Sequence, residues 1–267
     1  MSMSALDIRI EGIGFWAPGW PNWQAARAGL RGDLQADPAV IKPSPDVLVA
    51  AERRRAPLAV LLACDVAAQA CADSGRNADT LASVFASTHG DLVITDYMCS
   101  TLAIAPRELS PIKFHNSVHN APAGYWTIAA HCHAASTSIS SWHSTFAVAL
   151  FEAAVQANAD QLPVLLAAYD ADSPSPLNEV SPASSIYGVA MVVAPARDHE
   201  ASLRLRFNAP VRPSASMHLP RAFADMAGSN PMAAQSLPLL AALASARPHI
   251  LQLNAGLQST LGIEVCT

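Results

Sequence analysis

Two neighbouring stretches indicate the fold class most clearly: residues 57–74, PLAVLLACDVAAQACADS, and residues 81–87, LASVFAS. The first is long, alanine-rich and mostly apolar, and Gly75 ends it, a pattern typical of a buried helix. The second is a short apolar run of strand length. A buried helix that leads into a buried strand favours a layered α/β fold around a mixed sheet.

The same alternation continues along the chain. We expect further strands at 8–15, 136–141, 163–169, 187–194 and 203–208, and further helices at 23–30, 94–102, 124–130 and 145–158. Residues 110–120 and 209–220 are predicted loops, 237–244 a short helix, and 250–253 and 261–265 edge strands. Because there is no long linker and no internal repeat, residues 1–267 are predicted to form a single domain, with 200–267 as a possible C-terminal extension.

The composition excludes several classes of protein. Of the 267 residues, 51% are hydrophobic and 14% are charged, which is the opposite of the signature of disorder. The net charge of −5 lacks the basic footprint of nucleic-acid binding. The longest apolar runs are too short to span a membrane, and residues 1–12 carry no secretory signal. The five cysteines form no CxxC pair, so we expect reduced thiols and a cytoplasmic protein.

Residues 113–146 are rich in histidine and contain His115, His119, His131, His133 and His143, with Lys113 as the only formal charge. The HxxxH spacing of His115 and His119 would place two imidazoles on one face of a helix, as in some zinc sites. Pro111 and Pro122 flank this pair, however, and the segment contains no carboxylate. Packing or interface roles therefore explain these histidines better than a metal site, and no metal is expected.

Other motifs of catalysis and cofactor binding are missing from the sequence. It contains no GxSxG, no GxxxxGK[ST] and no GxGxxG, so no cofactor is expected. Asp170 and Asp172 follow a predicted strand, but the Ser- and Pro-rich segment around them indicates a solvated loop. Cys64 and Cys71 lie seven residues apart on one face of the predicted helix, which indicates core packing.

Several segments resemble the N-terminal half of a β-ketoacyl-ACP synthase, a thiolase-fold protein. These segments are IEGIGFWAPG (10–19), SVFASTHGD (83–91), NAPAGYWTI (120–128), PVLLAAYDAD (163–172) and YGVAMVVAP (187–195). ERRRAPLAV (52–60) and SPIKFHNSVHNAPAGYW (110–126) are more similar to a short ketosynthase-like group found with aryl-polyene biosynthesis, whose members look like chain-length factors. The resemblance implies a thiolase-like layered fold, truncated to roughly the N-terminal half of a ketosynthase.

The resemblance also implies that the catalytic groups are missing. Its register places the family's nucleophilic cysteine at His143, and the neighbours Trp142 and Ser144 are not cysteines either. Cys132 lies eleven residues upstream, before the predicted strand. The two catalytic histidines of the synthases belong to their C-terminal half, and no His-Gly-Thr motif occurs here. We therefore expect no catalytic residue and no condensation by this chain alone.

A partner role follows from the same resemblance. Residues 136–141 are expected to pair across a two-fold interface with a catalytic ketosynthase. The expected interface and substrate-tunnel residues are Phe114, His115, His119, Asn120, Tyr125, Trp126, Ser138, Trp142 and His143. The predicted function is that of a non-catalytic, chain-length-factor-like subunit for elongating polyene, polyketide or fatty-acid-type chains. The acyl carrier protein would be bound mainly by the partner.

Two alternatives stay open at this point. One is a small independent acyltransferase or thioester hydrolase that uses His143 as a base with Ser144 or Ser141. The other, weaker one is a histidine-rich metal-binding protein. The basic cluster Arg53–Arg55 could contact an acidic carrier, although a solvated helix start explains it more simply.

Overall fold

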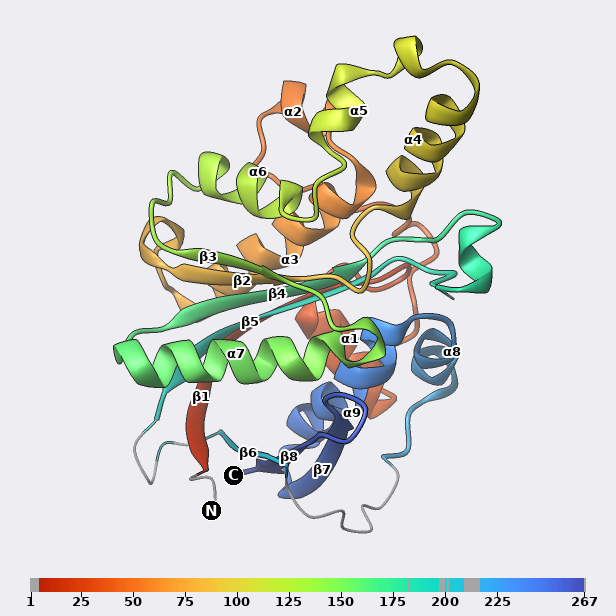
Figure 1. The fold of residues 1–267 in the computed structure, drawn as a ribbon. Helices are drawn as coiled ribbons and strands as arrows, with labels where there is room; N and C mark the ends of the chain where they lie inside the picture. The colour runs from red at the N-terminus through yellow and green to blue at the C-terminus, as the bar shows by residue number, and fades with distance from the viewer. Residues whose placement is uncertain (1–4, 182, 197–199, 201, 209–216, 267) are drawn as a thin grey trace.

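The computed structural model describes residues 5–181, 183–196, 200, 202–208 and 217–266. Its framework is an eight-stranded mixed sheet with the order β3-β2-β4-β5-β1-β6-β8-β7 (Figure 1). The strands are β1 (Leu6–Trp16), β2 (Ala82–Ala86), β3 (Ser136–Ile139), β4 (Val164–Asp170), β5 (Tyr187–Pro195), β6 (Leu203–Phe207), β7 (His249–Asn254) and β8 (Thr260–Val265). β2 runs parallel to β3 and β4, and the other pairs are antiparallel.

Helices cover both faces of this sheet. They are α1 (Trp23–Arg31), α2 (Ala50–Arg55), α3 (Leu58–Ser74), α4 (Leu92–Ile104), α5 (Pro111–His115), α6 (Ala121–Ala129), α7 (Thr145–Asp160), α8 (Arg221–Ser229) and α9 (Pro231–Ser245). Figure 1 shows α3 and α6 on one face and α1, α7 and α9 on the other. The arrangement is a three-layer α/β fold, as the sequence predicts.

The central strands are apolar on both sides because each face has its own hydrophobic core. In β4, Leu165 and Tyr169 belong to the core under α3, whereas Val164 and Leu166 belong to the core under α7. This alternation follows from the two-residue period of a strand. Cys64 and Cys71 are buried in the α3 core, which confirms the prediction of core packing.

Most predicted elements are present, with four corrections. Residues 110–120 contain the short helix α5, which Ser110 caps and which begins with Pro111. The predicted helix 237–244 is longer and begins at Pro231 after the cap Asn230, and α8 precedes it. β8 lies between β6 and β7, so of these two predicted edge strands β7 lies at an edge of the sheet and β8 does not. β3 ends at Ile139.

Of the predicted loop 209–220, residues 209–216 lie outside the described residues. β6, β7 and β8 extend the same sheet from β1 onward. No helix among the described residues is long and apolar enough to cross a membrane.

Candidate functional site

The carboxyl ends of three parallel strands meet at one end of the sheet. β2 lies between β3 and β4 in parallel register, so the turns that follow these strands are neighbours. Residues 87–91 follow β2, residues 140–144 follow β3, and Asp170 ends β4. Ligand sites of open α/β sheets are commonly found at such strand ends.

Asp170 is buried and holds the turn after β2. Its Oδ1 accepts hydrogen bonds from Ser87 Oγ at 3.0 Å and Thr88 N at 2.8 Å, and its Oδ2 accepts one from Thr88 Oγ1 at 2.6 Å. Ser140 Oγ, after β3, donates to Thr88 O at 2.7 Å. Burial outweighs the three donors and raises the pKa of Asp170 to about 6. The expectation that Asp170 lies in a solvated loop is therefore wrong, although Asp172 is exposed.

The turn after β2 carries His89, which the sequence analysis did not single out. Its ring packs edge-on against Trp142, with 4.7 Å between ring centroids and an interplanar angle of 87°. Trp142 makes a second edge-on contact with His143, at 5.1 Å and 90°. Burial lowers the pKa of His89, and the nearby His143 and His119 lower it further. No local motif points to His89, because its contact partner is more than fifty residues away in the sequence.

The turn from β3 into α7 is short and carries Trp142 and His143 at its surface. It contains one 3-10 turn, Trp142–Ser144, and Trp142 has a φ of 50°, in the left-handed region. Thr145 Oγ1 donates to Trp142 O at 2.6 Å and accepts from Ser141 N at 2.9 Å. No hydrogen bond joins His143 to Ser141 or Ser144 in the described part of the chain, so the geometry does not form a serine–base pair.

No cysteine lies at this turn. Cys132, the nearest one, is buried before β3, and its thiol donates to Leu81 O at 3.4 Å. A thiol nucleophile depends on a helix N-terminus or a neighbouring base that lowers its pKa. Just before the N-terminus of α7, this chain has Trp142, His143 and Ser144 and no thiol. No group of three or more metal-ligating side chains occurs among the described residues.

A groove of about 720 Å³ lies between α2, α5 and α6. Four of the predicted site residues line it, namely Phe114, His115, Asn120 and Tyr125. Glu52 and Arg55 supply its charged side chains, and Ile112, Val118 and Ile128 add apolar ones. The volume lies within the usual range of small-molecule pockets, and the lining is suited to an apolar ligand.

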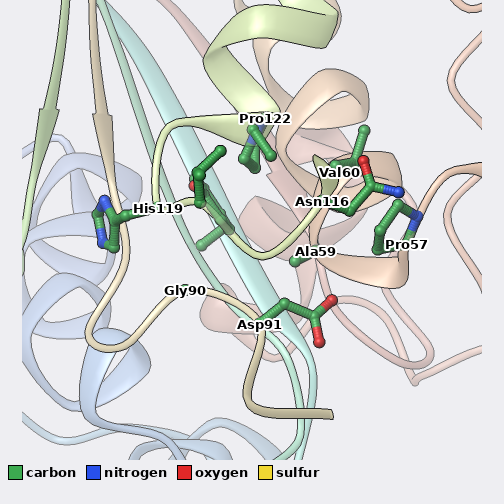
Figure 2. Close-up of a pocket in the computed structure, with 11 residues that line it drawn as sticks. Pro57, Ala59, Val60, Gly90, Asp91, Asn116, His119 and Pro122 are labelled. Carbon is green, nitrogen blue, oxygen red and sulfur yellow. The ribbon is translucent and has the colours of Figure 1, made fainter. Parts of the chain in front are cut away.

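The other predicted site residues lie elsewhere. His119 lies beside a smaller cavity next to the groove, and its Nε2 is 3.2 Å from Ser87 O (Figure 2). Trp126 is 1% exposed and packs in the core under α3. Ser138 lies on β3, and Trp142 and His143 lie at the turn after it. The predicted residues therefore lie in five different places, namely the groove, the small cavity, the core, the sheet edge and the turn before α7.

β3 is an edge strand of the sheet with one unpaired side. Ala135 O and Ile139 O accept hydrogen bonds from β2, from Ser83 N and Ser87 N. Successive residues of a strand point their backbone N–H and C=O groups in alternate directions. The backbone N–H and C=O groups of Ser136 and Ser138 therefore face the open edge. Such an edge is a template for pairing with another chain.

An apolar surface lies close to this edge. Of sixteen exposed large hydrophobic residues among those described, eight fall between residues 93 and 142. They are Val93, Leu102, Ile104, Ile112, Phe114, Val118, Ile128 and Trp142. Except for Trp142, which lies in the turn before α7, they belong to α4, α5, α6 and the turns between them, which form the upper part of the molecule in Figure 1. A concentration of this kind is typical of a protein–protein interface.

The fold is that of a ketosynthase-like protein. Residues 20–255 match the family model of the β-ketoacyl synthase N-terminal domain, and the chain belongs to this family. A search of curated proteins found no match.

Three solved structures share the fold. One is the ketosynthase ApeO in complex with its chain length factor ApeC from Xenorhabdus doucetiae, with a TM-score of 0.71, 22% identity, and coverage of 97% of this chain and 99% of that one. The second is the ishigamide ketosynthase/chain length factor, with a TM-score of 0.68, 15% identity, and coverage of 97% and 99%. The third, AntDE:AntF, is a type II PKS acyl-carrier protein in complex with its ketosynthase, with a TM-score of 0.67, 13% identity, and coverage of 98% and 100%. The predicted family and thiolase-like layered fold are confirmed.

Proposed function

We propose that this chain is a non-catalytic, chain-length-factor-like subunit that pairs with a catalytic ketosynthase. The observation that carries the proposal is the unpaired edge of β3 beside the exposed apolar surface of α4–α6. A strand edge and an apolar surface on one side of a molecule are well suited to one large partner. We propose that residues 1–267 act in this role as a single domain and that the complex works in the cytoplasm.

The chemistry at the strand ends supports a partner role over independent catalysis. The turn before α7 holds Trp142, His143 and Ser144 and no thiol, and His143 has no hydrogen bond to either neighbouring serine within the described residues. Without an activated nucleophile, this turn offers no group, among its described residues 140–145, that is set up to accept an acyl chain from a thioester. Condensation would then take place on the partner.

The groove between α2, α5 and α6 suggests what the subunit contributes. It is largely apolar and adjoins the proposed interface through Phe114 and Ile128. We propose that it helps to enclose the growing acyl chain, with bulky side chains such as Phe114 and Tyr125 limiting its length. The substrate would be a polyene, polyketide or fatty-acid-type chain on an acyl carrier protein, and the resemblance to the aryl-polyene group favours a polyene. Solved relatives of this fold include ketosynthase–chain length factor pairs.

Co-expression with a catalytic ketosynthase from the same genome tests the proposal, which predicts that such an enzyme is encoded nearby. We expect a one-to-one complex by size-exclusion chromatography and intact mass, and acyl condensation only when both chains are present. If the chain elutes alone and well folded, the partner role is excluded. The isolated chain should then be assayed for thioester hydrolysis, with His143→Ala as the inactive variant.

Matched variants locate the interface. Ser138→Pro removes an N–H on the open edge of β3 and leaves the bonds to β2 in place, so complex formation should be lost while the fold is kept. Ile104→Asp on α4 should weaken the complex at least tenfold. Leu257→Asp is the control, because Leu257 is also fully exposed but lies between β7 and β8. Equal effects of the two Asp variants would place the interface elsewhere.

A further inference from the structure

A small cavity lies next to the groove, at the carboxyl ends of β2 and β4 (Figure 2). Its walls come from the start of α3, the turn after β2, residues 116–122 and the end of β4. Its volume is about 10 Å³, against about 720 Å³ for the groove. A volume of this size is close to the minimum that holds one water molecule and is too small for any larger ligand.

Two buried polar atoms belong to residues that line this cavity. Tyr169 is completely buried and Asn116 is 5% exposed. Neither Tyr169 OH nor Asn116 Oδ1 has a hydrogen-bond partner within the described part of the protein. The equally buried Tyr187 differs, because its hydroxyl bonds directly to Ser236 Oγ at 2.7 Å. A buried hydroxyl without a partner is costly, so native structures pair such groups with protein or with ordered water.

We propose that the cavity binds one ordered water molecule that bridges Tyr169 and Asn116. The water accepts a hydrogen bond from Tyr169 O–H and donates one to Asn116 Oδ1. Two protein partners in a site of one-water volume meet the usual requirements for a buried structural water. This inference rests on the cavity and its two polar groups, and it does not depend on the proposed function.

The water has a structural role for the groove. Val118 and Ala121 line both the cavity and the groove, so the segment 116–122 is the wall between them. A direct contact, from His119 Nε2 to Ser87 O at 3.2 Å, ties this wall to the turn after β2. The bridging water would tie the same wall to β4. The His119–Ser87 contact and the bridging water would then together hold the wall of the groove next to Val118 in place.

A crystal structure of the full chain, or of its complex, at a resolution of about 1.5 Å or better tests the site directly. We expect a water peak within hydrogen-bond distance of both Tyr169 OH and Asn116 Oδ1. The proposal is overturned if the cavity shows no peak, or if these two atoms bond to other protein groups.

The sign of a stability change provides a second test. If the water is bound, Tyr169→Phe should lower the urea midpoint, as should the control Tyr187→Phe, which breaks a direct bond. If the Tyr169 hydroxyl has no partner, its removal should leave the midpoint unchanged or raise it, and the proposal fails.

A double-mutant cycle between Tyr169→Phe and Asn116→Ala should show coupling through the shared water. The control cycle between Tyr187→Phe and Asn116→Ala should be additive. Additivity in the first cycle would contradict a bridging water. If Asn116→Ala does not fold, Tyr169→Phe and the crystal structure still decide the question.

Discussion

Asp170 shows how one buried carboxylate organises the strand-end site. It holds Ser87 and Thr88, and the next residue, His89, contacts Trp142 at the turn before α7. The position of His89 therefore depends on a side chain more than eighty residues away. A carboxyl group with three donors is a strong anchor even though its burial disfavours the charge.

The pH dependence of stability should report this burial. The pKa of Asp170 is raised to about 6 in the folded chain, against an ordinary value of 3.8 for an aspartate side chain. The folded state therefore holds its proton on Asp170 more tightly than the unfolded state does. The stability that this difference provides is fully present below pH about 4 and is lost as the pH rises through about 6. The free energy of unfolding of the wild type, relative to Asp170→Asn, should fall by about 2 kcal/mol from pH 4 to pH 7.

Urea titrations at several pH values measure this difference. Asp7 and Glu11 have lowered pKa values because of Arg204 and Arg76 respectively, and they contribute the opposite slope. Comparison with Asp170→Asn removes their contribution, since both proteins contain them. Asp172→Asn, at an exposed position, is the control and should follow the wild type. A constant difference between wild type and Asp170→Asn across this range would contradict the assignment.

Trp142 provides a second test at the residue scale. Its φ of 50° is in the left-handed region, where a Cβ is unfavourable. Trp142→Gly should therefore be more stable to urea than Trp142→Ala by about 1 kcal/mol. Val155, in the middle of α7, is the control, because Gly should there be less stable than Ala by about 1 kcal/mol. The same order at both positions would show that residue 142 is not left-handed.

At the scale of elements, the closest packing joins β1 and α3. A Cβ at Gly12 or Gly14 would overlap backbone atoms of α3, among them the carbonyl oxygen of Val66. The glycines thus let α3 lie directly on the sheet. The contact sets the distance of α3 from the sheet. Because α6 packs in the same core as α3, it also sets how far α6 and the groove lie from the sheet.

Substitution of these glycines should separate packing from helix propensity. Gly14→Ala should lower the free energy of unfolding by about 3 kcal/mol or more, because rigid backbone cannot move away from the new methyl group. Gly124→Ala is the control: it lies in α6 with open space around it and should stabilise the chain by about 1 kcal/mol. Chemical denaturation of both variants checks this, and a mild effect of Gly14→Ala would argue against the close packing.

At the scale of the whole molecule, the exposed apolar residues are distributed unevenly. Half of the large ones within the described residues lie in the segment 93–142, beside the open edge of β3. The opposite side of the sheet is formed by β6, β8 and β7, with α9 packed beneath, and carries fewer exposed large hydrophobic residues among those described. This asymmetry is what the proposed subunit role requires, because an interface is richer in exposed apolar residues than the rest of an isolated subunit's surface.

The isolated chain should therefore bind an environment-sensitive hydrophobic dye and self-associate as its concentration rises. Dye binding and self-association should both fall when the proposed ketosynthase partner is added, because the same surface becomes buried. Fluorescence titration and analytical ultracentrifugation measure the two effects. Dye binding that is unchanged in a verified complex would show that the apolar surface is not the interface.

The linear sequence was sufficient for the family and for most of the longer helices and strands. Apolar runs in α3, β2, β4 and β5 are local signals, and their alternation predicts a layered α/β fold. The segments around Asn120–Ile128 and Ser83–Asp91 identified the ketosynthase resemblance. The missed helices α5 and α8 are short, and α5 buries no residue while α8 buries Phe223, so neither contains a long apolar run.

The tertiary structure alone decided which distant groups meet. The strand order β3-β2-β4 brings Asp170, His89 and Trp142 to one end of the sheet, although loops and helices separate them in the chain. The burial of Asp170 and Trp126 and the exposure of Ile104 depend in the same way on which layers lie above them. Local patterns carry no information about such neighbours, because strand order is set by the packing of all the layers together.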